Sequence, residues 1–190
     1  MGGELERSVK RYEERRKGIP AWAEYLRIPL PDGAELLPDL TIGGKTPKQL
    51  VELLDSTKGI HVGDFVSRSI LRSKEFTTLS DPQTITPVKV TPLAMGFTSP
   101  PTIEEIFTRA DEFDWDKLPA EAACYLAIVM KDESLKEPLI MGMKQMIDWT
   151  GFPSVLSLER RGNDLWLLDT WAGLDFKYSP RYEFVFSLRK

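Results

Sequence analysis

The chain has 190 residues, of which 42% are hydrophobic and 28% charged, and its formal net charge is −4. This composition is typical of a folded globular domain, and the five tryptophans and nine phenylalanines argue against general disorder. The acidic balance disfavours general attraction to nucleic acid phosphates. The single cysteine, Cys124, has no intrachain disulfide partner. We expect one α+β domain over residues 19–190, preceded by a polar helical arm over residues 1–18.

The arm is predicted from strong helix formers and the absence of proline in residues 4–17. Its apolar stripe, Leu5, Val9 and Tyr12, is narrow for a helix that docks on its own domain. Residues 7–17 hold six basic and two acidic side chains, a charge of +4, which leaves −8 on the rest of the chain. We therefore interpret the arm as a contact for a protein partner or a second copy, made by Arg7, Lys10, Arg11, Arg15 and Arg16.

Two helices are predicted in the next part of the chain, after an irregular stretch that is rich in proline and glycine. Thr46, followed by Pro47 and Gln49, forms a capping box that starts a helix ending at Gly59. Asp64 is expected to cap a second helix over Phe65–Lys74. The pair has the outline of a helix-turn-helix, with Arg68, Arg72 and Lys74 on the second helix. A nucleic-acid-associated regulator is therefore one alternative, although the acidic body disfavours nucleic acid as a partner.

One strand and one helix are predicted in the middle of the chain. The β-branched run Thr84–Val90 indicates a strand, which Pro87 should confine to a sheet edge. Thr102 and Glu105 form a second capping box before apolar residues at helical spacing, which predicts a helix over Ile103–Phe113.

The C-terminal part shows alternating and β-branched patterns that predict about five short strands. Arg161-Gly162-Asn163-Asp164 indicates a tight hairpin connection. Short connections favour an antiparallel meander that follows the helices, which is an α+β arrangement. The predicted strands are Tyr125–Lys131, Leu139–Ile147, Ser154–Arg160, Leu165–Trp171 and Tyr182–Leu188.

Several short segments of this half resemble an uncharacterised group of bacterial proteins. They are Leu118–Ala122, Gly142-Met143, Leu156–Arg160 and Phe184–Lys190. The resemblance implies a bacterial origin and carries over no activity, because the group has none assigned.

The candidate catalytic residues are His61 and Cys124. His61 is the only histidine and stands between the two predicted helices, so a turn residue is the simplest interpretation. A Cys124–His61 pair remains an alternative, because such partners meet in space and not in sequence. Cys124 lies in the apolar run Ala122–Met130, which favours a small buried hydrophobe over a nucleophile.

The candidate metal ligands are Asp111, Asp114 and Asp116, since hard cations take oxygen ligands. The EF-hand pattern is absent, so a solvated helix end is the simpler interpretation. No cofactor motif is present: Gly43-Gly44-Lys45-Thr46 lacks the first glycine of a phosphate loop, and we expect no cofactor.

Trp166 and Trp171 belong to an aromatic cluster in the β half that favours core packing or an interface. Our leading hypothesis is a non-catalytic protein that binds another macromolecule. A carboxylate- or metal-assisted hydrolase is the second hypothesis. The chain shows no apolar leader and no apolar run of membrane length, so we expect a cytoplasmic protein with no membrane partner.

Overall fold

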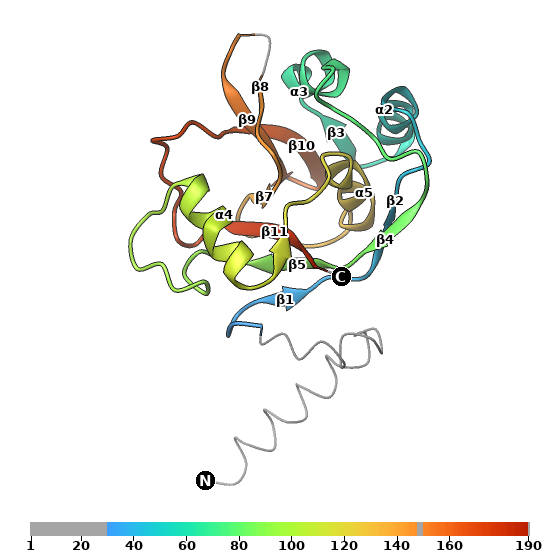
Figure 1. Cartoon of the computed structure of the whole chain (residues 1–190). Helices are drawn as coiled ribbons and strands as arrows, with labels where there is room; N and C mark the ends of the chain where they lie inside the picture. The colour runs from blue at the N-terminus through green and yellow to red at the C-terminus, as the bar shows by residue number, and fades with distance from the viewer. Residues whose placement is uncertain (1–29, 148–149, 190) are drawn as a thin grey trace, which may run out of the picture.

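The architecture is α+β, with helices placed between strands along the chain (Figure 1). The structure is a computed structural model and describes residues 30–147 and 150–189. The α-helices of the described residues are α2 (Pro47–Ser56), α3 (Asp64–Arg68), α4 (Ile103–Glu112) and α5 (Ala122–Val129). A short 3-10 turn over Ile70–Arg72 follows α3.

A mixed sheet of nine strands forms the centre of the described chain. Along its path, in spatial order, lie β1 (Glu35–Leu36), β5 (Pro87–Val90), β11 (Glu183–Leu188), β7 (Leu139–Met141), β9 (Pro153–Arg161), β10 (Asp164–Trp171) and β3 (Ile60–Val62). Beside this path, β6 (Trp115–Asp116) pairs with β11, and β8 (Met146–Ile147) pairs with β9. A separate antiparallel pair consists of β2 (Leu40–Ile42) and β4 (Gln83–Ile85).

The predicted β9–β10 hairpin and the α+β fold class are confirmed, but the prediction of a C-terminal antiparallel meander is wrong. β9 and β10 pair antiparallel, and Arg161 faces Asp164 across the Gly162–Asn163 loop. The sheet is mixed because β7 runs parallel to β11 and β3 runs parallel to β10. β11 also reaches back to β5, which lies far earlier in the chain. Short connections did not determine strand order here, because pairing depends on which strands can bury their faces together.

The predicted strand over Tyr125–Lys131 is also wrong, because this segment lies in α5 and the turn that follows it. The run Ala122–Val129 is apolar on every side, and α5 packs against α2, β2, β9 and β10. A short apolar run buried on several sides has no periodicity that separates a helix from a buried strand. The three alanines of this run favour the helix.

The helix-turn-helix outline is not formed. β3 lies between α2 and α3 and pairs with β10, so the two helices are not joined by a simple turn. The second helix is also shorter than predicted, and Gly63 occupies its N-cap position in place of Asp64. The β-branched residues of Ile60-His61-Val62 explain the difference, since they favour an extended strand.

The predicted edge strand over Thr84–Val90 is divided between two sheets, as β4 and β5. Pro87 does not lie at an edge, because β5 has β1 on one side and β11 on the other. A proline is accepted there because it is the first residue of the strand. Its carbonyl accepts a hydrogen bond from the Leu37 backbone N–H at 2.9 Å.

Both predicted capping boxes are confirmed. The Thr46 side chain accepts from the Gln49 N–H, and the Gln49 side chain accepts from the Thr46 N–H. Thr102 and Glu105 form the same reciprocal pair at the start of α4. These bonds satisfy N–H groups that the first helical turn leaves without partners.

The aromatic side chains of β11 lie at the centre of the core. Phe184 and Phe186 are fully buried, and the Phe186 ring meets Phe107 of α4 edge to face at 6.2 Å. Figure 1 shows α4 lying across β11. The Phe186 ring lies directly against Gly142, at a position where a Cβ atom would collide with it.

The described residues do not include the predicted arm or residues 19–29 of the irregular stretch. In the part of the chain that is described, no helix has the length and hydropathy of a membrane span.

Candidate functional site

Five large hydrophobic side chains are exposed along one end of the sheet, and we call them the aromatic edge. Their exposed fractions are 48% for Ile147, 50% for Phe152, 43% for Trp171, 71% for Leu174 and 38% for Phe176. They lie on β8, directly before β9, at the end of β10 and in the loop between β10 and β11. Figure 1 shows β8 and the start of β9 at the top of the molecule and the loop between β10 and β11 at the left.

Strand pairing brings the residues of the aromatic edge together. Ile147 lies opposite Pro153 in the β8–β9 register, and Ser154 of β9 lies opposite Trp171 of β10. The rings of Phe152 and Trp171 are 4.9 Å apart. The touching rings of Phe152 and Trp171 therefore form one apolar surface, and Leu174 and Phe176 follow Trp171 in the adjoining loop.

Specific contacts hold the loop that carries the edge in one conformation. Gly173 lies under the Trp171 indole, where a Cβ atom would overlap the ring. The buried Tyr178 hydroxyl donates to the Trp171 carbonyl at 2.6 Å, and the Gln145 side chain donates to the Ala172 carbonyl at 2.9 Å. The exposed surface is therefore preorganised, which lowers the entropy cost of binding a partner.

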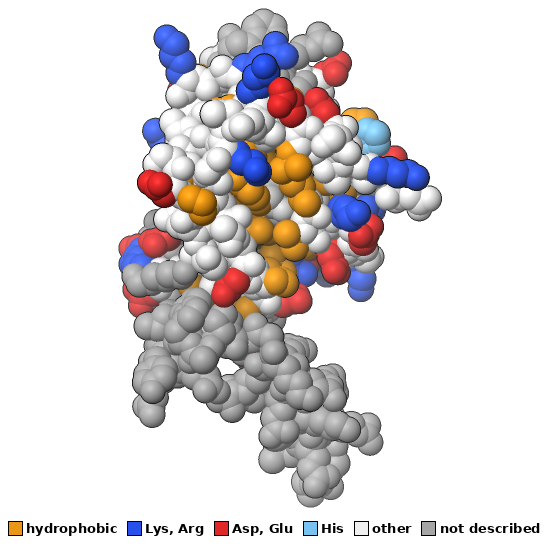
Figure 2. Space-filling model, turned by 90° about the vertical axis from the view of Figure 1, so that its right-hand side faces the viewer, with side chains coloured by type: hydrophobic (Ala, Val, Ile, Leu, Met, Phe, Trp, Pro, Cys, Tyr) orange, Lys and Arg blue, Asp and Glu red, His pale blue; other side chains and the backbone are white. Residues whose placement is uncertain are grey.

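The face that carries α2, β2 and β4 at the right of Figure 1 also has apolar atoms. Figure 2 shows a band of hydrophobic side chains there, bordered by acidic and basic groups. In α5, which packs against α2 and β2, Val129 is 50% exposed, whereas Tyr125 and Ile128 are half-buried. Val129 has the same exposed fraction as Phe152 but lies on α5, so it serves as a comparison of equal exposure away from the aromatic edge.

His61 and Trp166, both singled out from the sequence, contact each other on neighbouring strands. Their rings stack at 4.8 Å, and His61 Nε2 lies 3.1 Å from an Asp164 carboxylate oxygen. The Arg161 guanidinium lies 5.4 Å from the centre of the Trp166 ring. The Trp166 ring is therefore engaged by His61 and Arg161, whereas Trp171 belongs to the aromatic edge.

Cys124 is fully buried in α5, while His61 is a half-exposed residue of β3. Burial, followed by the nearby charge of Glu121, raises the pKa of the Cys124 thiol to about 12. A thiol in this setting stays protonated and has little nucleophilic character at neutral pH. The structure thus offers no support for a Cys124–His61 pair.

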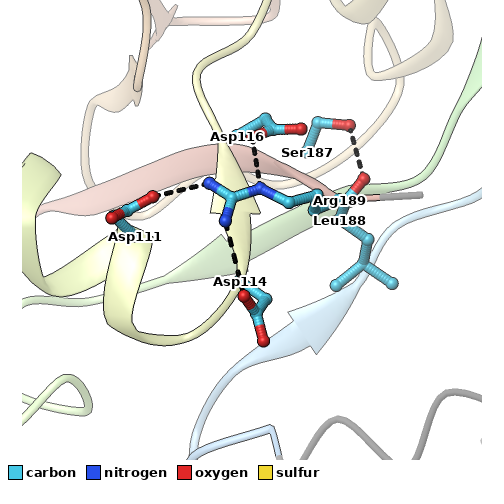
Figure 3. Close-up of polar contacts among 6 residues, drawn as sticks. All are labelled: Asp111, Asp114, Asp116, Ser187, Leu188 and Arg189. Carbon is cyan, nitrogen blue, oxygen red and sulfur yellow. Dashed lines mark hydrogen bonds and ion pairs between the residues drawn. The ribbon is translucent and has the colours of Figure 1, made fainter.

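The three aspartates predicted as metal ligands surround one arginine (Figure 3). Arg189 contacts Asp111 at 2.6 Å, Asp116 at 2.8 Å and Asp114 at 3.4 Å, each through a different guanidinium nitrogen. These hydrogen bonds raise the pKa of Arg189, so the guanidinium stays charged. Among the described residues, no group of three or more His, Cys, Asp or Glu side chains is arranged to hold a metal ion.

An open groove of about 400 Å³ lies beside this arginine, between α4 and the β6–β11 pair. Its floor consists of Phe107, Trp115 and Phe186, which are at least 94% buried. A ligand would therefore contact charged rim residues such as Lys117 and find little apolar surface. This groove offers a smaller apolar contact than the aromatic edge.

Glu121 is a buried carboxyl group that the sequence patterns did not single out as a site. It is fully buried, and one of its oxygens accepts from the Leu79 backbone N–H at 2.7 Å. The other oxygen has no hydrogen-bond partner among the described residues. Burial raises the pKa of Glu121, and the N–H groups of Leu79 and Gly43 oppose this shift in part. Glu121 directly precedes the apolar helix α5, and no repeating sequence pattern indicates that a single glutamate at this position is buried.

Comparison of the chain with protein-family models, with curated proteins and with solved structures finds no match. The function of the protein is therefore inferred from the surface chemistry of this chain alone. The basic residues of the predicted arm lie outside the described residues.

Proposed function

We propose that this protein is a non-catalytic interaction protein that docks another protein on its aromatic edge. The observation that carries the proposal is the contact between the exposed rings of Phe152 and Trp171, with the exposed side chains of Ile147, Leu174 and Phe176 on the adjoining strand and loop. In a chain that buries most of its other large hydrophobic side chains, such a surface is best explained by a partner.

The apolar area is large enough to matter for affinity. Exposed at these fractions, five side chains of this size present roughly 400–500 Å² of apolar surface. Burying that area gains about 10 kcal/mol in transfer free energy before the cost of association is subtracted. An apolar centre with a polar rim is also the usual anatomy of a protein interface.

Side-chain chemistry favours a protein partner over a nucleic acid. Asp175, which is exposed between Leu174 and Phe176 of the edge, is acidic, and the chain is acidic overall. Base stacking on aromatic rings normally accompanies a basic groove that neutralises the phosphates. The engaged ring of Trp166, beside Arg161, leaves Trp171 as the central aromatic anchor of the edge.

Site-specific cross-linking in the cells that make the protein tests this proposal. A photoreactive amino acid replaces Leu174 in one variant of the full chain and Val129 in the other, since both residues are strongly exposed. We expect a discrete cross-linked protein from position 174, lost when Trp171→Ser is added, and no such product from position 129. Equal products from both positions, or a product that survives Trp171→Ser in a folded protein, would refute the edge as a docking surface.

A further inference from the structure

We propose that the groove between α4 and the β6–β11 pair binds a small organic cation, whose ammonium group takes the place of the Lys117 side chain. The groove and the aromatic edge have no residue in common, so this inference is independent of the proposed docking. Three properties of the groove support it: the position of the Lys117 ammonium, the charge of the rim and the volume.

The chain itself places a cation on the floor of the groove. The Lys117 ammonium nitrogen lies 4.1 Å from the centre of the Phe107 ring. A ring face attracts a cation at this distance because of its negative electrostatic potential. In the described part of the chain, Lys117 forms no ion pair with a carboxylate. The face of Phe107 is therefore a cation-binding surface that a lysine of the same chain covers.

The Phe107 ring is held in place, whereas the lysine that covers it can move. Phe107 is 6% exposed, and Phe186 of β11 meets its ring edge to face at 6.2 Å. Trp115 supports Phe186 in turn, with ring centres 6.2 Å apart. Lys117 is exposed and directly follows β6, so its long side chain can turn into water at little cost. Displacement of Lys117 would uncover the ring without rearranging the core.

The charge of the lining favours a cation over an anion. The groove is lined by three acidic side chains, Glu104, Asp111 and Asp116, and by two basic ones, Lys117 and Arg189, a sum of −1. Arg189 is held by the two aspartates (Figure 3). Glu104 forms no ion pair among the described residues. When Lys117 leaves the ring, the lining that remains carries −2, which attracts a positively charged ligand.

The volume of the groove indicates a small molecule. About 400 Å³ lies near the lower end of the range for small-molecule sites. Aromatic faces are the usual partners of quaternary ammonium ligands, in which methyl groups surround the charge. The expected ligand is therefore an alkylammonium compound similar in size to choline.

Proton NMR titration of the purified full chain with choline tests the proposal. We expect saturable binding with a dissociation constant of about 1–10 mM. The methyl resonance of choline should move upfield, because a ring face shields nearby protons. The neutral analogue, in which a tert-butyl group replaces the trimethylammonium group, should bind at least about 10-fold more weakly, because it has the shape without the charge.

Two surface substitutions should change choline binding in opposite directions. Lys117→Ala should tighten it by about 5–10-fold, because the competing ammonium is removed and Phe107 is uncovered. Glu104→Gln should weaken it by about 3-fold, because the lining loses a negative charge. Arg109→Ala is the matched control: it removes a positive charge from α4 whose guanidinium lies over Phe97, 5.8 Å from the ring centre. This control leaves Phe107 covered and should change binding by less than about 2-fold.

Three outcomes would overturn the proposal. The first is a native chain that shows no saturable choline binding below about 50 mM. The second is a neutral analogue that binds as tightly as choline. The third is an equal gain from Arg109→Ala and Lys117→Ala, which would show general attraction of charge and no site at the ring. Phe107→Leu should abolish binding, and unchanged binding in this variant, folded by circular dichroism, would also contradict the site. The Lys117 and Glu104 variants alter exposed side chains, so they test the proposal even if Phe107→Leu fails to fold.

Discussion

Glu121 shows how a single carboxyl group ties α5 to two loops. Its side chain accepts from Leu79, while the neighbouring Tyr125 hydroxyl donates to the Gly43 carbonyl at 2.9 Å. The Gly44 backbone N–H donates to the Leu79 carbonyl, so both loops are also joined to each other. A buried carboxyl with one unpartnered oxygen is costly when it is charged. Burial therefore raises the pKa of Glu121 above that of an exposed glutamate, in agreement with its unpartnered oxygen.

We predict that Glu121→Gln removes a pH-dependent part of the stability. Because burial raises the pKa of Glu121 above its ordinary value of 4.5, the folded chain holds this proton more tightly than the unfolded chain. The stabilisation is fully present below pH 4.5 and is lost as the pH rises through the folded pKa. Urea unfolding at several pH values should show the variant gaining stability relative to the native chain as the pH rises. A constant difference from acid to neutral pH would show that Glu121 titrates normally.

We predict that Cys124 reacts slowly with thiol reagents in the native protein. A thiol with a pKa of about 12 is ionised in roughly one molecule in ten thousand at pH 8, and it is also fully buried. Labelling with a maleimide should be at least about 100-fold slower than in the urea-unfolded chain. Equal rates in a protein that is folded by circular dichroism would place Cys124 at the surface and reopen its pairing with His61.

At the scale of elements, the C-terminal strand organises the core. β11 pairs with β5, β6 and β7, and its aromatic side chains pack against α4 and β6. Arg189 extends this role, since it ties the end of the strand to the α4–β6 turn through three aspartates. The turn carries Asp114, whose φ of 56° is the one positive value among the described non-glycine residues. Its carbonyl accepts from the Arg189 backbone N–H at 3.0 Å.

We predict that Phe186→Ala destabilises the fold by about 3–5 kcal/mol, the usual cost of removing a fully buried phenylalanine. The close approach of its ring to Gly142 leaves little room for neighbours to fill the cavity. Phe152→Ala is the matched control and should cost less than about 1.5 kcal/mol, because Phe152 is half exposed. Denaturant unfolding measures both. A loss below about 1 kcal/mol for Phe186→Ala would place this ring outside the core.

At the scale of the whole molecule, the aromatic edge is one place where hydrophobic side chains are held together without cover. Gly173 and Tyr178 keep the edge in shape from within, so its exposure belongs to a packed structure and not to a loose loop. The contact that we predicted for Arg7, Lys10, Arg11, Arg15 and Arg16 lies outside the described residues and stays a prediction. Both predictions concern association, but they differ in their dependence on salt. Salt weakens binding through the basic arm, whereas binding through the apolar edge is largely unaffected.

The sequence by itself determined several local structures whose interactions lie close together in the chain. The capping boxes at Thr46 and Thr102 are such cases, because each involves residues within one helical turn. The β9–β10 hairpin is another, since its strands are joined by the two-residue loop Gly162–Asn163. The α+β class also followed from composition and pattern.

Tertiary structure alone decided the rest. The apolar run Ala122–Val129 became a helix because it is buried against several elements, and a short run of this kind is compatible with helix and strand alike. Strand order depended on contacts between distant segments, such as β11 with β5, which no local pattern encodes. The same holds for the candidate site. Strand register brought Ile147, Phe152 and Trp171 to one end of the sheet and placed Trp166 against His61, because neighbours across a sheet are set by pairing and not by sequence distance.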